Sequence, residues 1–415
     1  MTNTLNDPGI KLSSSLADLS AITGQTGKGL KEIEGYARDN AKTFGGSAAE
    51  GVEAYKLILS KDNDKLVALK SLLKKADNLI KEEVVYSVMD KKQTPPSGDK
   101  HDYMSTGPYW WPDPTKPDGL PYIKKDGLRN PTYYDISDSQ EIDKVEDASL
   151  SLALAYYFTK DAKYANFTSK LLKVWFLNPE TRQNPHLNFA QGIPGINTGR
   201  GTGLIETRDL YRVLDAAILI QNTPNWSKED HLALKKWFSE YLTWMLESPI
   251  GKDEAEAKNN HGTFYSEQVI AFALFIDKPE IALNEIEIFK NRMESQLKSD
   301  GSQPLELART KSWGYVNMNM FGYYLIAQLA ENLNISLWDH QISEGKNMKK
   351  ALEFIMPYLK NEKVWEYEQI QKISYGETIK ILKFASRKYN NPEYEEIAKK
   401  IDIKTYQSEL NELTF

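Results

Sequence analysis

Residues 228–247, KEDHLALKKWFSEYLTWMLE, and residues 264–276, FYSEQVIAFALFI, carry the pattern that decides the fold. Apolar residues recur in them at intervals of three and four, which is the period of an α-helix with a buried face. The sequence therefore predicts roughly a dozen helices and almost no strand, because similar segments recur along the chain. These segments lie at 52–85, 145–159, 161–177, 207–221, 280–297, 316–333, 347–359, 376–389 and 393–401.

The connections between these segments are mostly short and often end in Pro, Gly or Asn, which makes neighbouring helices antiparallel. No residue signature repeats at a fixed period, as it would in a helical repeat array. We therefore predict an all-α fold, an α/α toroid built as an incomplete barrel of helix hairpins, over a single domain at residues 49–415. Residues 1–48 are rich in Ser, Thr, Gly and Asp, and we expect them to be weakly ordered.

Composition excludes several kinds of function. The 415 residues include 52 Lys and Arg against 58 Asp and Glu, so a net charge of −6 argues against a general nucleic-acid binder. The absence of cysteine excludes disulfides, thiolate zinc sites, iron–sulfur clusters and a cysteine nucleophile. No apolar run approaches the roughly 20 residues that span a bilayer, and no signal peptide is recognisable in the given sequence.

Helical periodicity disappears between residues 90 and 135, where prolines and aromatic residues concentrate. Long irregular segments are uncommon unless they serve a site, and the Asp126-Gly127 pair predicts a small hairpin there. The aromatic residues could form a stacking platform for a sugar, or a plug that holds the loop on the body. The candidates for ligand contact in this segment are His101, Tyr103, Trp110 and Trp111.

Residues 184–208 hold five glycines between positions 192 and 203. We interpret the segment as a loop whose backbone approaches a ligand closely. It is not a phosphate loop, because it lacks the GxxxxGK[ST] pattern and no predicted strand precedes it. The polar side chains expected to contact the ligand are Asn188, Gln191, Arg200, Glu206 and Arg208.

Two further segments are polar where helix packing does not require it: KNNHGTFY at 258–265 and QPLELARTKSWGY at 303–315. In the first, His261 precedes a helix expected from Thr263 onward, and no second histidine lies at a metal-binding spacing. The second contains Arg309 and Tyr315. Six of the nine arginines fall between positions 182 and 309, and this concentration predicts the binding of a carboxylate.

These residue types suit β-elimination of a 4-linked polyuronate. An amide and a guanidinium can neutralise the substrate carboxylate while a base removes the C5 proton and an acid protonates the departing O4. Histidine is a base near neutral pH, and tyrosine is one only if a cation such as Arg309 favours its phenolate. In mannuronate or glucuronate both groups leave from one side, so a single tyrosine suffices, whereas guluronate requires His261 and Tyr315 on opposite faces.

The segments NNHGTFY and SQPLELARTKSWGY, with HDYMSTGPYWWPDP and GRGTGLIETRDLYR before them, resemble the alginate lyase family of bacterial polysaccharide lyases. The resemblance implies an α/α toroid that cleaves alginate or a related polyuronate without metal or cofactor, in the periplasm or outside the cell. It also implies roles for individual residues. Asn260 and Arg309 would neutralise the carboxylate, His261 would be the base or its helper, and Tyr315 the acid or acid/base, with Tyr323 and Tyr324 as alternative tyrosines.

Three other functions fit the same residues. The chain could be a lyase for another polyuronate such as glucuronan. It could be a glycoside hydrolase, which needs two carboxylates and could draw them from Glu206, Asp209 and Glu306. A non-catalytic glycan-binding protein would keep Trp110, Trp111 and the arginines but would not need His261 or Tyr315.

Overall fold

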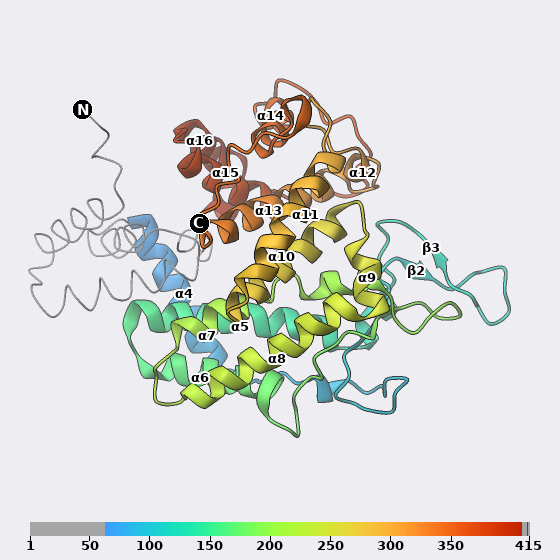
Figure 1. The fold of residues 1–415 in the computed structure, drawn as a ribbon, viewed down its shortest axis with the longest axis vertical. Coiled ribbons are helices and arrows are strands. Elements are labelled where there is room, and N and C mark those ends of the chain that lie inside the picture. The colour runs from blue at the N-terminus through green and yellow to red at the C-terminus, as the bar shows by residue number, and fades with distance from the viewer. Residues whose placement is uncertain (1–62, 409–412, 414–415) are drawn as a thin grey trace, which may run out of the picture.

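The computed structural model describes residues 63–408 and residue 413. The segment at 1–48, the boundary that follows it and the first part of the helix expected at 52–85 lie outside these residues. Within them the all-α prediction is confirmed, since helices form an α/α toroid with only four short strands (Figure 1). The helices are α4 (Asn63–Glu82), α5 (Asp138–Thr159), α6 (Ala162–Leu172), α7 (Tyr211–Leu219), α8 (Lys228–Glu247), α9 (Pro249–Ala255), α10 (Asn260–Phe275), α11 (Pro279–Gln296), α12 (Pro304–Leu307), α13 (Ser312–Glu331), α14 (Met348–Leu359), α15 (Gly376–Lys388), α16 (Pro392–Ile401) and α17 (Ile403–Tyr406).

The helices pack mainly against neighbours in the chain. Helix α5 contacts α6 and α7, α10 contacts α11 and α13, and α13 contacts α15. In Figure 1, α10, α11 and α13 cross the middle of the molecule, between the layer of α5 to α8 and the group of α14 to α16. Almost every residue of α10 and most of α13 are buried, as expected of helices that are apolar all round.

The four strands form two small pairs. Strands β1 (Met104–Thr106) and β4 (Phe189–Gly192) are parallel, and β2 (Trp110–Trp111) and β3 (Ile123–Lys124) form an antiparallel hairpin that projects beside α9 (Figure 1). The prediction of a hairpin turn at Asp126-Gly127 is wrong, because that pair follows β3. Strand β4 also falls in the glycine-rich segment, for which a loop was predicted.

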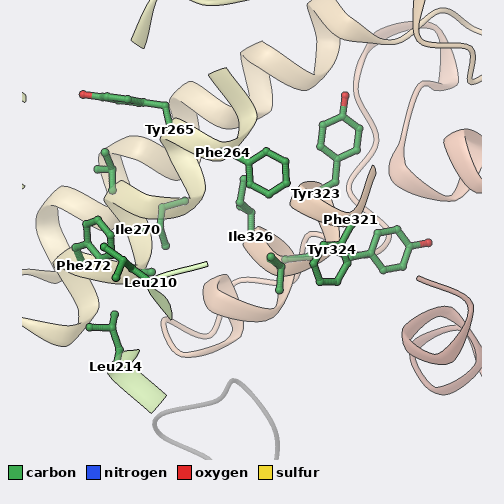
Figure 2. Close-up of a cluster of buried hydrophobic side chains, with 14 of the residues drawn as sticks. Leu210, Leu214, Phe264, Tyr265, Ile270, Phe272, Phe321, Tyr323, Tyr324 and Ile326 are labelled. Atoms are coloured by element: carbon green, nitrogen blue, oxygen red, sulfur yellow. The ribbon is translucent and has the colours of Figure 1, made fainter. Parts of the chain in front are cut away.

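The hydrophobic core joins the central helices, and Figure 2 shows part of it between α10 and α13. Tyr323 and Tyr324 belong to this core and are fully buried. The Tyr323 hydroxyl donates to Gln296 Oε1 at 2.6 Å. Neither tyrosine can therefore contact a substrate as the protein stands, which removes them as alternatives to Tyr315.

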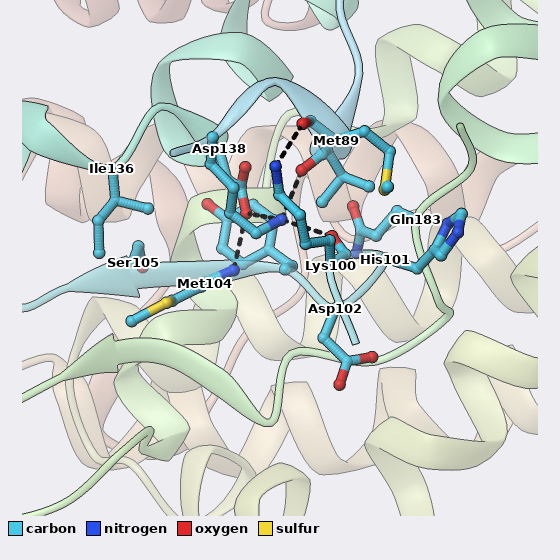
Figure 3. A network of polar contacts seen from close by, with 12 residues as sticks. Met89, Lys100, His101, Asp102, Met104, Ser105, Ile136, Asp138 and Gln183 are labelled. Atoms are coloured by element: carbon cyan, nitrogen blue, oxygen red, sulfur yellow. Dashed lines mark hydrogen bonds and ion pairs between the residues drawn. The ribbon is translucent and has the colours of Figure 1, made fainter. Parts of the chain in front are cut away.

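A buried ion pair fixes the irregular segment before α5. The side chains of Lys91 and Asp138 have no exposed surface, and Lys91 Nζ lies 3.0 Å from Asp138 Oδ2. Lys91 Nζ also donates to the carbonyl of Lys100 at 2.8 Å, and the Met104 amide donates to Asp138 at 2.8 Å (Figure 3). Burial raises the pKa of Asp138 to about 7 and lowers the pKa of Lys91. This network attaches the start of β1 to the first turn of α5.

Among the described residues, no helix combines the length and the apolar character that crossing a bilayer requires.

Replacing one partner of this ion pair should destabilise the fold strongly, because the other charge is left buried without a counter-ion. We expect Lys91→Met and Asp138→Asn each to lower the free energy of unfolding by about 3–5 kcal/mol, measured by urea denaturation. The double variant should be more stable than either single variant. The control is Lys75→Met, which breaks the half-exposed pair with Asp147 and should cost about 1 kcal/mol or less. Equal, small effects in all variants would contradict the argument.

Candidate active site

A cleft of about 460 Å³ opens between the β2–β3 hairpin, the glycine-rich segment and the first turns of α10 and α13. The four residues predicted to be catalytic, although up to 55 positions apart in the chain (315 − 260 = 55), all line it: Asn260, His261, Arg309 and Tyr315. The volume lies in the ordinary range for small-molecule sites. The structure thus brings the two polar segments together, as the sequence predicted.

The asparagine–histidine segment begins α10 instead of preceding it. Two side chains of α11 anchor the start of this segment. Gln296 Nε2 donates to the Asn259 carbonyl at 2.8 Å. Arg292 donates to the carbonyls of Ala255 and Ala257 at 2.8 Å each. Arg292 and Gln296 are both buried. The first turn of α10 is therefore a rigid support for His261.

Glu306 of α12 joins the two predicted segments directly. Its Oε1 accepts the Asn260 backbone amide at 2.6 Å, and its Oε2 accepts Asn260 Nδ2 at 2.7 Å. Glu306 is 1% exposed and Asn260 is fully buried, and burial raises the pKa of Glu306. Both carboxylate oxygens are thus occupied, so Glu306 is not available as a hydrolytic carboxylate.

His261 is oriented by a second buried carboxylate, Glu254 of α9. His261 Nδ1 lies 2.6 Å from Glu254 Oε1, and Glu254 is 2% exposed. An ionised carboxylate can only accept a hydrogen bond, so the proton of the neutral ring is on Nδ1. The other nitrogen, Nε2, then has its lone pair available to take a proton.

Arg309 and Tyr315 form a second hydrogen-bonded group. Arg309 Nη2 donates to the Tyr315 hydroxyl and to Asp126 Oδ1, both at 2.7 Å, and the Tyr315 hydroxyl donates to Tyr109 at 3.0 Å. Burial alone would raise the pKa of Asp126, but hydrogen bonds from Arg309 and Thr310 lower it to about 2. Asp126 therefore holds Arg309 as a permanent counter-ion.

The phenol of Tyr315 is protonated in this arrangement. Burial raises its pKa above the ordinary value, and the hydroxyl of Tyr109 adds to the increase, against the opposing charge of Arg309. Because Asp126 neutralises Arg309, the guanidinium does not by itself create a phenolate. Tyr315 thus has a proton that it can donate.

Comparisons with known proteins show the family to which this chain belongs. A family model described as alginate lyase matches residues 87–365. A crystal structure of an alginate lyase from Bacteroides ovatus is 37% identical, with a TM-score of 0.82, over 87% of this chain and 97% of that one. The chain belongs to the alginate lyase family. The predictions of that family and of a polysaccharide lyase are therefore confirmed.

More distant alginate lyase structures share the fold. Alginate lyase A1-III from Sphingomonas species A1 is 16% identical, with a TM-score of 0.52, over 78% of this chain and 89% of that one. A variant of alginate lyase A1-III in complex with a tetrasaccharide is 15% identical, with a TM-score of 0.53, over 78% of this chain and 86% of that one. No significant match is found among curated proteins.

Part of the support for this alginate lyase site comes from beyond the matched region. Ser312, at the start of α13, donates from its backbone amide and its hydroxyl to the Glu368 carbonyl at 3.2 and 2.7 Å. The Ile370 amide donates to the Thr310 carbonyl at 2.9 Å. Residues 368–370 therefore brace the turn between Arg309 and Tyr315, and no sequence signal pointed to this contact.

The glycine-rich segment has a different role from the predicted one. None of its glycines lines the cleft. A side chain at Gly199 would meet the Asn188 carbonyl oxygen at 2.0 Å, and one at Gly203 would meet Ala190 Cβ at 2.4 Å. The glycines thus let this segment pack closely on itself and, at Gly195 and Gly201, on Pro121 and on Asp253 and Glu254. Close packing of the protein, and not access of a ligand, requires them.

Four polar side chains of this segment do line the cleft: Gln191, Arg200, Glu206 and Arg208. Arg200 donates to Gln191 Oε1 at 2.7 Å and lies over the ring of Trp110, which also lines the cleft. Glu206 Oε2 accepts hydrogen bonds from Tyr103 at 2.9 Å and Ser105 at 2.6 Å, and burial raises the pKa of Glu206 to about 7.

Four other predicted contact residues are outside the cleft lining. Tyr103 is fully buried beneath Glu206, and Asn188 Oδ1 accepts the indole N–H of Trp244 at 2.9 Å. His101 Nδ1 lies 2.6 Å from the Arg182 carbonyl, and the Trp111 indole donates to the Leu128 carbonyl at 2.9 Å. These residues support the walls of the site, so the expectation that they contact the ligand directly does not fit their positions.

Charge in the cleft has the opposite sign to that of the whole chain. Five cationic side chains and three acidic ones line it: Lys124, Arg129, Arg200, Arg208 and Arg309 against Asp143, Glu206 and Asp209. Asp209 is paired with Arg208 and Arg212. A net positive cleft attracts an anionic polymer to an acidic protein. Within residues 63–408 no cluster of three His, Asp or Glu side chains is arranged to hold a metal ion.

Sequence reasoning did not assign five features of this site: Tyr109, Asp126, Arg129, Glu254 and the asparagine anchor Glu306. No sequence pattern marked Glu254 as part of the site, because it lies among other charged residues near the end of a helix, and such helix ends are common. The Asp126 contact with Arg309 joins residues 183 positions apart, and no local pattern predicts such a distance.

Glu254 should determine the tautomer of His261. In the wild-type protein, nitrogen-15 NMR of the neutral ring should show Nδ1 protonated and Nε2 bare. In Glu254→Leu the ring loses its acceptor, and we expect a mixture of tautomers. Glu256→Leu is the control, because Glu256 lies two residues away and is exposed. An unchanged spectrum in Glu254→Leu would show that another group orients the ring.

Proposed function

We propose that this protein cleaves alginate by β-elimination and leaves a 4,5-unsaturated uronate at the new end. The observation that carries the proposal is that His261 and Tyr315 line one cationic cleft, with His261 Nδ1 oriented by Glu254 and the Tyr315 hydroxyl bonded to Arg309. The Bacteroides ovatus relative, an alginate lyase 37% identical over most of both chains, supports alginate as the substrate. We infer that the polymer is met outside the cytoplasm.

In the proposed reaction His261 Nε2 removes the C5 proton, and Tyr315 donates its proton to the departing O4. The carboxylate charge that develops is neutralised by Arg309, whose Nη1 makes no hydrogen bond to any described residue, and by the side-chain amide of Asn259, which lines the cleft. Asn260 is fully buried with its amide on Glu306, so it supports this turn and does not meet the carboxylate as the resemblance implied. These groups supply the base, the acid and the anion stabilisation that elimination needs, and no step in the scheme uses a metal.

A glycoside hydrolase is less well supported. The three carboxylates available to it are all engaged: Glu306 by Asn260, Asp209 by two arginines, and Glu206 by Tyr103 and Ser105. Glucuronan is the second candidate substrate. In glucuronate the C5 proton and O4 leave from the same side of the sugar, and the side chains of this cleft could serve that elimination as well.

Incubation with alginate should produce absorbance near 235 nm, which only elimination creates because only it forms the conjugated double bond. Tyr315→Phe should lower kcat by about 10²–10⁴-fold, the usual contribution of a general acid. The control is Tyr358→Phe in α14, outside the cleft. New reducing ends without absorbance would mean hydrolysis, and binding without either would mean a glycan-binding protein.

His261 should be the base on both polymers, because Tyr315 keeps its proton at rest. For polyguluronate, where proton and leaving group lie on opposite faces, we expect His261→Ala to lower kcat by about 10²–10⁴-fold. For polymannuronate the loss should be as large, because a protonated phenol cannot take the C5 proton. His340→Ala is the matched control outside the cleft. A clearly smaller loss on polymannuronate would show that Tyr315 is the base there.

A further inference from the structure

Arg129 stands out among the cations of the cleft because no acidic side chain of the described residues pairs with it. Arg309 is bound to Asp126, Arg208 to Asp209, and Arg200 to Gln191. Neither Arg129 nor Lys124 forms an ion pair with any residue that the structure describes, and both are exposed at the cleft. In a chain of net charge −6, two exposed cations without ion partners in one cleft indicate an anionic ligand.

The guanidinium of Arg129 is held by two tyrosines. Its central carbon lies 4.8 Å from the ring centre of Tyr133 and 5.7 Å from that of Tyr134, and Nη1 donates to the Tyr134 hydroxyl at 3.1 Å. The two rings are nearly perpendicular, at 81°, so they fix the guanidinium from two directions. The protein uses one of its N–H groups in this way, and the others remain for a ligand. These groups match a carboxylate, which arginine binds with two parallel hydrogen bonds.

The backbone that carries Arg129 is anchored beside the proposed acid. Asn130 donates from its backbone amide to the Pro108 carbonyl at 2.8 Å and from Nδ2 to the Trp110 carbonyl at 2.9 Å. These two acceptors flank Tyr109, whose hydroxyl lies 3.0 Å from that of Tyr315. Asn130 is 4% exposed. The Arg129 loop is thus fixed to the backbone on both sides of Tyr109, the residue whose hydroxyl contacts Tyr315.

We propose that Arg129, held by Tyr133 and Tyr134, forms a subsite for the carboxylate of a uronate next to the sugar that is cleaved. Lys124 adds a second positive charge, and the exposed ring of Tyr134 offers an apolar surface to the sugar. The subsite rests on the proposed function, because it binds a neighbouring unit of the same polymer. It contributes to substrate binding and takes no part in the proton transfers.

The test compares Arg129→Ala with wild type on alginate and on a series of alginate oligosaccharides of increasing length. On the polymer, kcat/KM should fall about tenfold because KM rises while kcat stays the same. A change of this size is expected when one charge-assisted hydrogen bond is lost at an exposed site. On the shortest oligosaccharide that is still cleaved the loss should nearly vanish, because that substrate does not reach the subsite. Arg129→Lys should lose an intermediate amount, and added salt should shrink the difference.

Arg182→Ala is the control, since Arg182 is an exposed arginine outside the cleft. Its kinetics should match wild type. An unchanged KM in Arg129→Ala on every substrate, or an equal loss of kcat on every length, would overturn the subsite. Failure of the wild-type protein to generate absorbance near 235 nm on any polyuronate would instead overturn the proposed function.

Discussion

The site depends on the pair of hydrogen bonds between Glu306 and Asn260. They tie the short helix α12 to the first turn of α10, and so they hold the segment of Arg309 and Tyr315 against the segment of His261. The bonds are short, buried and made to a carboxylate, which is the strong class of hydrogen bond. A buried carboxylate that lost these donors would be costly to retain, so the two halves of the site are joined firmly.

Each functional side chain is controlled by a neighbour that does not face the substrate. Glu254 directs His261, Asp126 holds Arg309, and Tyr103 and Ser105 hold Glu206. Glu254, Tyr103 and Ser105 are buried, where low dielectric strengthens their effect, whereas Asp126 keeps a quarter of its side chain exposed. The result is an imidazole with a free lone pair and a protonated phenol in the same cleft.

Electrostatics separates the cleft from the rest of the molecule. The chain is acidic overall, yet the cleft lining carries more cations than anions. Several of the cations have protein counter-ions, which keep them in place without removing them from the surface. Arg129 and Lys124 lack counter-ions among the described residues, and they extend the positive surface along the cleft beyond the reacting sugar.

The sequence by itself determined the helical architecture and singled out the two polar segments that line the cleft, because helix periodicity is local and because polar residues at helix ends stand out from packing. It also predicted helix α8 to the residue, where Ser227 and Asp230 form a capping box. Tertiary structure alone decided which groups support them. Glu254, Asp126 and residues 368–370 act across folded distances, and the buried Tyr103 and the self-packed glycines look in the sequence just like ligand contacts. Local patterns cannot distinguish a side chain that faces a cleft from one that faces the wall behind it.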